Sequence, residues 1–91
     1  MDTRAFETLL ARDGFDETLT RRLDPGHTVP PHTHPFDVRA LVLQGEITLT
    51  SDAGTRTFAA GEVFTMDAGR QHAELYGPAG VSYLVGRRRT A

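Results

Sequence analysis

The 91-residue sequence contains no cysteine, which excludes disulfide bonds, thiolate metal ligands and a cysteine nucleophile. It has no apolar run near the roughly eighteen residues that span a bilayer, and we do not expect Met1–Arg4 to open a signal peptide. It also lacks an excess of charge of one sign, because the net charge is −2 and acids and bases are mixed along the chain. We therefore expect a cytoplasmic protein that binds neither nucleic acid nor membranes.

The length of 91 residues limits the chain to one domain. A domain of this size buries a smaller share of its surface than a larger one, so a lone copy would be only modestly stable. Pairing with a second copy would bury more surface, and we therefore expect a homodimer.

A short helix is predicted at the N-terminus, over Asp2–Asp13. Phe6, Leu9 and Leu10 fall on one face of this helix, and Gly14 can adopt the left-handed conformation that ends it. We expect the apolar face to pack on the outside of a barrel or against a partner chain.

Alternating apolar and polar residues predict strands through the rest of the chain. The predicted strands are Phe15–Leu23, Phe36–Leu43, Glu46–Thr50, Thr55–Phe58, Val63–Met66, His72–Tyr76 and Val81–Val85. In the first of them Phe15, Leu19 and Leu23 share a face, which suits an edge strand. Gly45 and Gly77–Gly80 are expected to separate consecutive strands. About eight short strands, with turns every 8–12 residues, are typical of a sandwich or barrel.

Two histidines separated by one residue, His32 and His34, are the most specific chemical feature of the sequence. In an extended segment their side chains share a face, about 6–7 Å apart at the backbone, so both imidazoles can reach one metal ion. His72 is the better candidate for a third ligand because it is distant in sequence and starts its own strand, whereas His27 lies in a proline-bounded loop. The alternative is that these histidines are only polar residues of that loop.

Two segments around these histidines resemble the two conserved motifs of the cupin superfamily. Gly26–Gly45 is similar to the first motif, with a glycine, five residues, His32-Thr33-His34 and a strand that ends in glycine. Gly61–Tyr76 resembles the second motif, with a glycine, five residues, an aspartate, and a histidine three residues after another glycine. The resemblance implies an all-β cupin-like double-stranded β-helix, or jelly-roll barrel, over residues 15–91, and we expect the helix predicted above to occupy residues 1–14.

The resemblance also implies a metal site with three histidine ligands: His32, His34 and His72. It does not supply a fourth ligand, because Val38 stands where the first motif usually carries a glutamate. In the second motif Asp67 and Tyr76 replace the usual proline and asparagine. We expect one divalent transition metal ion, and iron, manganese, zinc, nickel and copper all accept imidazole ligands. Three ligands leave positions open for water, oxygen or a substrate.

Glu74 and Tyr76 are expected to join this site as catalytic residues, because alternate residues of a strand that begins with an inward-facing His72 also face inward. Glu74 could replace the missing glutamate ligand, fix the tautomer of a histidine ligand, or act as a general base. If the strand is irregular, Glu74 is instead an exposed charge. Tyr76 is either a proton donor or a half-buried aromatic residue.

Counting by twos from His34 places Val38, Ala40 and Val42 on the ligand face of the central strand. Asp37 lies near the vacant glutamate position but has the opposite parity, so we do not expect it to face the site.

Three other polar features lie near the motifs or at the end of the chain. Arg70 and Gln71 could guard the mouth of the cavity. Arg87–Arg89 are predicted to form a solvated tail, with phosphate binding as the alternative.

The functional hypothesis is a small metal-binding cupin that acts as an oxygenase or isomerase on a small organic molecule. The alternative is a non-catalytic module that binds or senses a small ligand, in which the histidines shape the cavity or hold a structural ion. Small cupins resemble the ligand-binding domains of transcription regulators, and we see no helix pair for DNA binding in this sequence. Neither hypothesis names a substrate.

Overall fold

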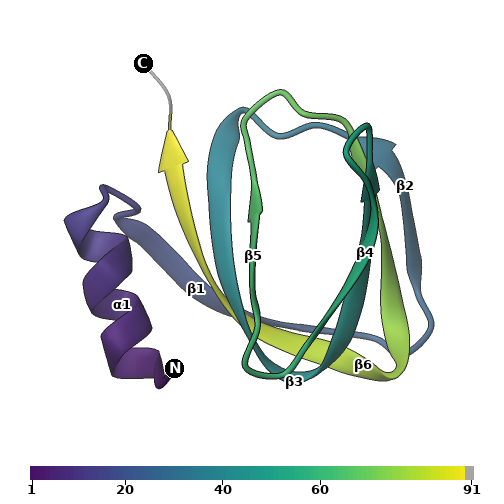
Figure 1. Cartoon of the computed structure of the whole chain (residues 1–91), viewed down its shortest axis with the longest axis horizontal. Helices are drawn as coiled ribbons and strands as arrows, with labels where there is room; N and C mark the ends of the chain where they lie inside the picture. Colours follow the sequence, from purple (N-terminus) through teal and green to yellow (C-terminus); the bar gives the residue numbers. More distant parts are fainter. Residues whose placement is uncertain (90–91) are drawn as a thin grey trace.

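The computed structural model describes residues 1–89, which form one helix and six strands. The elements are α1 (Thr3–Arg12), β1 (Glu17–Leu23), β2 (Thr28–His32), β3 (Phe36–Ser51), β4 (Gly54–Ala59), β5 (Val63–Met66) and β6 (His72–Arg89). All pairs are antiparallel, in the order β1-β6-β3-β4, with β2 also paired to β6 and β5 to β3. The sheet curls into a barrel with α1 outside it (Figure 1). The predicted all-β barrel with a short N-terminal helix is confirmed.

Two long strands, β3 and β6, replace four of the predicted short strands. β3 continues through Gly45 and β6 continues through Gly77–Gly80, where the sequence predicts turns. The register between the two strands shifts between Val42 and Gln44 and again between Gly45 and Ile47. Such bulges bend a strand sharply without ending it, so one long strand can line two sides of a barrel. The prediction of two strand breaks is therefore wrong.

Gly45 makes this bend possible. Its φ is 73°, in the left-handed region, and a Cβ at this position would overlap the carbonyl group of Gly80 on β6. Only glycine allows the two backbones to approach this closely.

The main hydrophobic core fills the interior of the barrel. On β3, Val38, Ala40 and Val42 point inward, whereas the intervening Leu41 belongs to a second cluster outside the barrel. This alternation agrees with the face predicted by counting from His34. The other strands contribute further buried residues to the inner core: Phe58, Phe64, Met66, Tyr76, Val81, Tyr83 and Val85.

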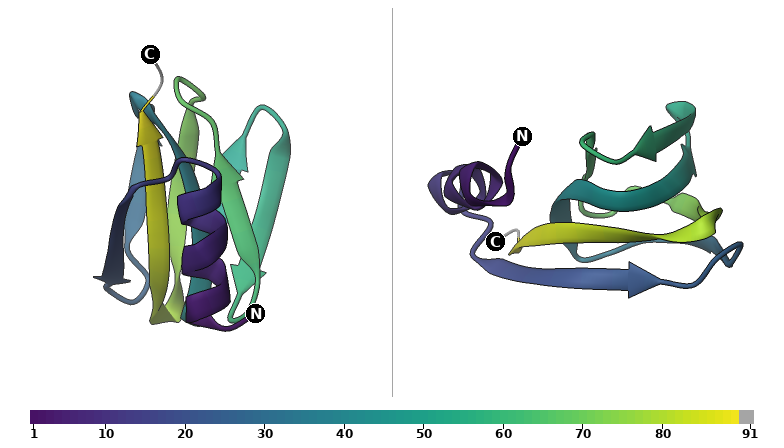
Figure 2. Two further views of the ribbon diagram at one scale, coloured as in Figure 1. Left: turned by 90° about the vertical axis from the view of Figure 1, so that its left-hand side faces the viewer. Right: turned by 90° about the horizontal axis from the view of Figure 1, so that it is seen from below.

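Helix α1 packs on the outside of the barrel, as its apolar face predicts (Figure 2). Phe6 and Leu10 are almost fully buried there, against Leu41 of β3 and Leu84 of β6. A Cβ at Gly86 would lie 2.7 Å from a methyl carbon of Leu10, so a glycine at this point of β6 lets the helix approach. Among the described residues, no helix combines the length and apolar character needed to cross a membrane.

Phe15 does not share the face predicted for it. It precedes β1 and is buried with the helix in the outer cluster, whereas Leu19 and Leu23 pack on the core inside the barrel. Gly14, with a φ of 82°, lies between the helix and Phe15, so the periodicity of β1 does not extend back to this residue.

The arginines at the end of β6 belong to the sheet, which corrects the prediction that Arg87–Arg89 form a solvated tail. Arg88 donates two hydrogen bonds to Oδ2 of Asp37, at 3.2 and 3.0 Å, and one to the carbonyl oxygen of Asp13 at 3.0 Å. Asp37 also accepts a hydrogen bond from the Ala68 amide at 2.8 Å. Asp37 therefore connects β3, β6 and the loop after β5, away from the histidines, in agreement with its predicted parity.

Replacing Asp37 by asparagine is expected to destabilise the protein at neutral pH but not at acidic pH. The Ala68 amide and then the Arg88 guanidinium lower the pKa of Asp37 below its usual value. Such a carboxylate stabilises the fold above its unfolded-state pKa of about 3.9 and loses this contribution as the pH falls through its folded-state pKa. Asp37→Asn should therefore lower the midpoint of urea unfolding at neutral pH, and the difference should shrink below about pH 4.

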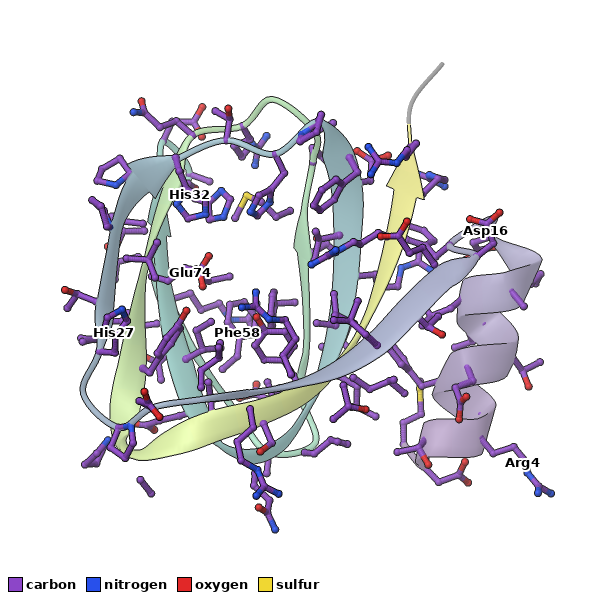
Figure 3. The ribbon with its side chains drawn as sticks, turned by 180° about the vertical axis from the view of Figure 1, so that it is seen from behind. Arg4, Asp16, His27, His32, Phe58 and Glu74 are labelled. Atoms are coloured by element: carbon purple, nitrogen blue, oxygen red, sulfur yellow. The ribbon has the colours of Figure 1, made fainter. Side chains whose placement is uncertain are left out.

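Asp16→Asn is the matched control, because Asp16 is exposed on the connection between α1 and β1 (Figure 3). Its unfolding midpoint should follow that of the native chain at both pH values. An equal loss of stability in Asp37→Asn at neutral and acidic pH would show that the carboxylate charge is not what stabilises this contact.

Candidate metal centre

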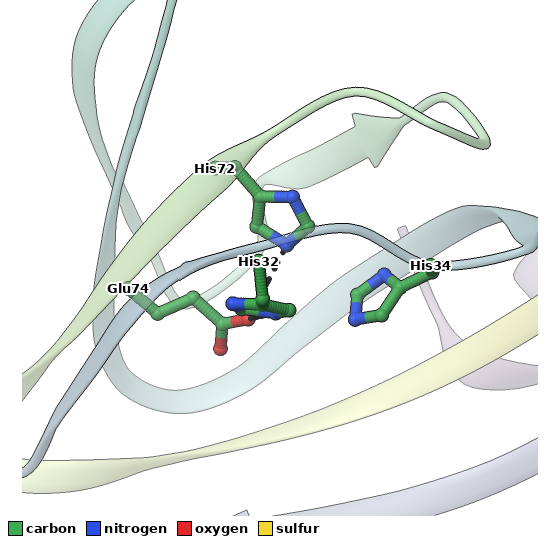
Figure 4. Close-up of side chains that lie close together, drawn as sticks. All are labelled: His32, His34, His72 and Glu74. Atoms are coloured by element: carbon green, nitrogen blue, oxygen red, sulfur yellow. Dashed lines mark ion pairs between the residues drawn. The ribbon is translucent and has the colours of Figure 1, made fainter.

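Four side chains that can bind a metal converge at one end of the barrel interior: His32, His34, His72 and Glu74 (Figures 3 and 4). His32 ends β2, His34 lies in the loop that follows, and the other two lie at the start of β6. The antiparallel pairing places His32 opposite His72. β2 pairs only with β6, so its prolines do not interrupt a ladder on a second side.

The geometry of this group suits a single ion. Its four ligand atoms all lie within 4.8 Å of one another. Two ligands on opposite sides of one ion, each about 2.0–2.2 Å from it, are at most about 4.4 Å apart, so a contraction of a few tenths of an ångström is sufficient. His72 is 3% exposed and the side chain of Glu74 is 11% exposed. An ion between them would be largely shielded from solvent.

Backbone carbonyl groups orient two of the rings. Nδ1 of His32 lies 2.9 Å from the carbonyl oxygen of Pro30, and Nδ1 of His72 lies 3.1 Å from that of Arg70. A carbonyl oxygen can only accept a hydrogen bond, so Nδ1 carries the proton in both rings, and Nε2 of the neutral ring has a free lone pair. Nε2 is therefore the atom available to a metal, with Nδ1 held by an outer partner as in many ligating histidines.

Glu74 brings a negative charge next to these two nitrogens. Its Oε2 atom lies 3.2 Å from Nε2 of His32 and 3.4 Å from Nε2 of His72 (Figure 4). A carboxylate oxygen that faces two free lone pairs is unfavourable unless a cation or protons lie between them. The donor set therefore fits a metal ion. Val38, where the first motif usually carries a glutamate, lies in the apolar core and offers no ligand.

His34 is held by packing on one side of this group. Burial lowers its pKa, the neighbouring His72 and His32 lower it further, and Glu74 opposes the shift. The neutral ring, which is the form that binds metals, is therefore favoured. The ring stacks on Phe36 with centroids 5.0 Å apart and an angle of 4° between the planes. Its Nδ1 atom is buried and has no hydrogen-bond partner among residues 1–89.

Tyr76 lies beside Glu74 inside the barrel, as alternation from His72 predicts. It is 5% exposed, and its hydroxyl donates a hydrogen bond to Oε1 of Glu74 at 3.2 Å. Burial and then the charge of Glu74 raise the pKa of Tyr76, so the hydroxyl stays protonated. Tyr76 therefore binds the carboxylate oxygen that does not face the two histidines. His27 is exposed and stacks against Tyr76 at 5.9 Å, outside the group.

A cavity of about 50 Å³ lies beside the metal-binding group. His34, His72 and Glu74 form part of its wall, together with two arginines, Arg21 and Arg87. Neither arginine is expected at this site from the sequence. The position of Arg21 could have been predicted, because it has the same parity in β1 as the inward-facing Leu19 and Leu23. Arg87 lies in a run of three arginines, in which nothing distinguishes it from its neighbours.

Arg70 and Gln71 lie in the loop before β6 and are not among the described residues that line this cavity. The side chain of Arg70 is 3.8 Å from a carboxylate oxygen of Asp52 and 3.9 Å from one of Asp67. The backbone carbonyl of Arg70 contacts the metal-binding group through Nδ1 of His72.

Three solved structures show the same fold at low sequence identity. A Rhizobium leguminosarum bv. viciae protein of unknown function has a TM-score of 0.76 at 22% identity, over 80% of this chain and 69% of that chain. KdgF from Halomonas sp. has a TM-score of 0.65 at 20% identity, over 80% of this chain and 69% of the KdgF chain. The DMSP lyase DddQ from Ruegeria pomeroyi has a TM-score of 0.70 at 23% identity, over 81% of this chain and 40% of the lyase chain. The TM-scores show a common fold. Sequence identities this low do not show a common activity.

A comparison with curated proteins found no match to this chain. A comparison with models of protein families did find one. The family described as cupin domain matches residues 19–74, which is more than half of the chain and contains all four members of the metal-binding group. Together with the barrel and its structural neighbours, this match shows that the chain belongs to the cupin family.

Proposed function

We propose that this cupin domain binds one divalent transition metal ion through His32, His34, His72 and Glu74. The observation that carries the proposal is the position of Glu74 Oε2, 3.2 and 3.4 Å from the Nε2 atoms of two histidines whose Nδ1 atoms face carbonyl groups. A cation between these atoms would satisfy all of them at once. Burial adds to the argument, because a carboxylate withdrawn from water needs a compensating charge.

The donor set limits the kind of metal. Three imidazole nitrogens and one carboxylate oxygen suit iron, manganese, zinc, nickel or copper. The group lies on the wall of a cavity, so a small molecule in that cavity can reach the ion. A bound ion would supply Lewis acid chemistry to an oxygen atom of that molecule.

We infer isomerisation rather than oxygenation as the reaction class. Glu74 and Tyr76 form a hydrogen-bonded carboxylate–phenol pair, which is able to hold and move a proton. A proton removed from one carbon of a substrate would be held at Oε1 of Glu74 and returned to another carbon, so the reaction needs no second substrate. The protonated Tyr76 would stabilise the charge on Glu74 before the transfer. Oxygenation would leave this pair without a role.

A second candidate function is a non-catalytic module that binds or senses a small ligand. The observation in its favour is that both oxygens of Glu74 already have partners, Tyr76 on one and two histidines on the other. In this case the contacts hold Glu74 in place as a ligand rather than as a base, and the ion would have a structural role.

The native protein should contain about one metal ion per chain when its metal content is measured by plasma mass spectrometry. His72→Ala and Glu74→Gln should each lose most of this metal, because each removes a ligand. His27→Ala is the matched control and should retain it, since His27 is exposed and outside the group. Circular dichroism should show that all three variants remain folded.

Two outcomes of this experiment would revise the proposal. A native chain that contains no metal and takes up none of the five candidate metals would contradict a metal site. Full metal content in Glu74→Gln, with loss in His72→Ala, would show a three-histidine site without Glu74 as a ligand.

Tyr76→Phe should lower the metal affinity by about 10- to 100-fold, the usual effect of removing a hydrogen bond to a ligand. Competition with a chelator measures this affinity. Tyr83→Phe is the control, because Tyr83 is equally buried in the inner core but makes no hydrogen bond to Glu74 among residues 1–89. An equal fall in affinity in both variants would indicate a general effect on the barrel and would remove Tyr76 from its proposed role.

Isomerisation and binding alone predict different fates for a ligand. In both cases a ligand found by thermal-shift screening should stabilise the protein, by about 2.7 kcal/mol at a hundredfold excess over its dissociation constant. Under isomerisation, NMR of the incubated ligand should reveal a rearranged product, and His72→Ala should abolish its formation. Recovery of unchanged ligand would favour the binding module.

A further inference from the structure

We propose that the cavity beside the metal-binding group binds the carboxylate of a small organic acid through Arg21 and Arg87. This inference rests on the proposed function, because the acid would be the ligand or substrate of the same site. It adds the chemical class of that ligand, and it is carried by residues outside the metal-binding group.

Arg87 offers a hydrogen-bond donor that nothing in the described chain uses. Its Nε atom is buried and has no partner among residues 1–89, and the residue lines the cavity. Its guanidinium lies over the ring of Phe36, with Cζ 4.8 Å from the ring centroid. Stacking of this kind fixes the plane of the guanidinium and leaves the N–H groups at its edge free. A buried N–H group without a partner is costly, so an acceptor in the cavity is favoured.

Arg21 reaches the same cavity from β1. It pairs with Tyr83 of β6 and has the same parity as Leu19 and Leu23, which pack on the inner core. The charge of Arg21 opposes the effect of burial, which raises the pKa of Tyr83, and this indicates that the guanidinium lies near the phenol. β1 and β6 therefore each contribute one arginine to the cavity wall.

The charges on the wall favour an anion. Arg21 and Arg87 contribute two positive charges, and Glu74 is the one carboxylate among the described residues that line the cavity. Glu74 already contacts two histidines and Tyr76, so it is not available to neutralise the arginines. A bound metal ion would increase the positive excess. The cavity therefore lacks the negative charge that a small acid would bring.

Glu17 makes a contact that an incoming acid would replace. Its Oε1 accepts a hydrogen bond from Nη1 of Arg87 at 3.3 Å, and its side chain is 49% exposed. A long bond to an exposed carboxylate contributes little. A carboxylate inside the cavity could instead form two shorter, parallel bonds with a guanidinium.

The remaining wall favours an organic acid over phosphate or sulfate. Val38, Phe64 and Met66 line the cavity and offer only apolar contacts. A cavity of about 50 Å³ has room for roughly three to five water-sized groups. A short-chain acid such as propanoate matches this size, with its hydrocarbon part on the apolar wall and its carboxylate on the arginines.

Propanoate is the probe for this proposal, and propanamide, an uncharged molecule of the same shape, is the ligand control. The melting temperature of the protein as purified is measured at increasing ligand concentration and constant ionic strength. Propanoate should raise it saturably, and propanamide should not. Arg21→Gln and Arg87→Gln should each weaken propanoate binding roughly 10- to 100-fold. Arg22→Gln should leave it unchanged, because Arg22 lies on the opposite face of β1 and does not line the cavity.

Glu17→Gln adds a test of opposite sign, since removing the competing carboxylate should strengthen propanoate binding. Weaker binding in this variant would contradict the proposal. An equal response to propanoate and propanamide, or native affinity in both Arg21→Gln and Arg87→Gln, would overturn it. Tighter binding of inorganic phosphate than of propanoate, lost in both arginine variants, would overturn the assignment to an organic acid.

The metal content of each sample separates this proposal from the metal site. Normal metal content, together with propanoate binding that is unchanged in both Arg21→Gln and Arg87→Gln, would overturn the carboxylate site but not the metal site. Binding that depends on Arg21 and Arg87 in a protein without metal would support the carboxylate site and contradict the metal site.

Discussion

The antiparallel pairing of β3 with β6 is the contact on which both the barrel and the metal-binding group depend. It runs from Phe36 opposite Arg89 to Ser51 opposite His72. Within residues 1–89, β1 and β2 pair only with β6, and β4 and β5 only with β3, so each of these strands is attached to this pair. Side chains alternate along a strand, so the pairing turns His72 and Glu74 inward in the first half of β6. The register shifts near Gly45 change the parity, so that Arg87, in the second half, also faces inward. A slip by one residue would turn all of them outward.

Sequence reasoning succeeds where one strand can be counted by itself. Alternation from His34 identifies the inward face of β3, and alternation from His72 places Glu74 and Tyr76 inside the barrel. It fails at Gly45 and at Gly77–Gly80, because a glycine with positive φ serves a bulge as well as a turn, and only the partner strand decides between them. It also misses the arginines, because the pairing of β1 with β6 is what brings Arg21 and Arg87 to one cavity. The homodimer and the cytoplasmic location stay predictions.

The carboxylate of the metal-binding group comes from a different strand than the glutamate that the first cupin motif usually carries. The first cupin motif usually carries a glutamate where this chain has Val38, on β3. Glu74 brings a carboxylate oxygen to the same histidines from the adjacent strand β6. A cation responds to the position and charge of an oxygen atom and not to the strand that carries it. The apolar side chain at Val38 then becomes part of the cavity wall.

The place of β6 at the end of the fold has a consequence for how the chain acquires its structure. β1, β2 and β3 all pair with β6, so during synthesis the edge of each strand that faces β6 remains unpaired until residues 72–89 have left the ribosome. Contacts between such distant parts of a chain form slowly. Helix α1 is made before the strands, but Leu41 and Leu84, against which it packs, come together only when β6 joins β3. A helix that is synthesised before all six strands is therefore among the last of these elements to dock.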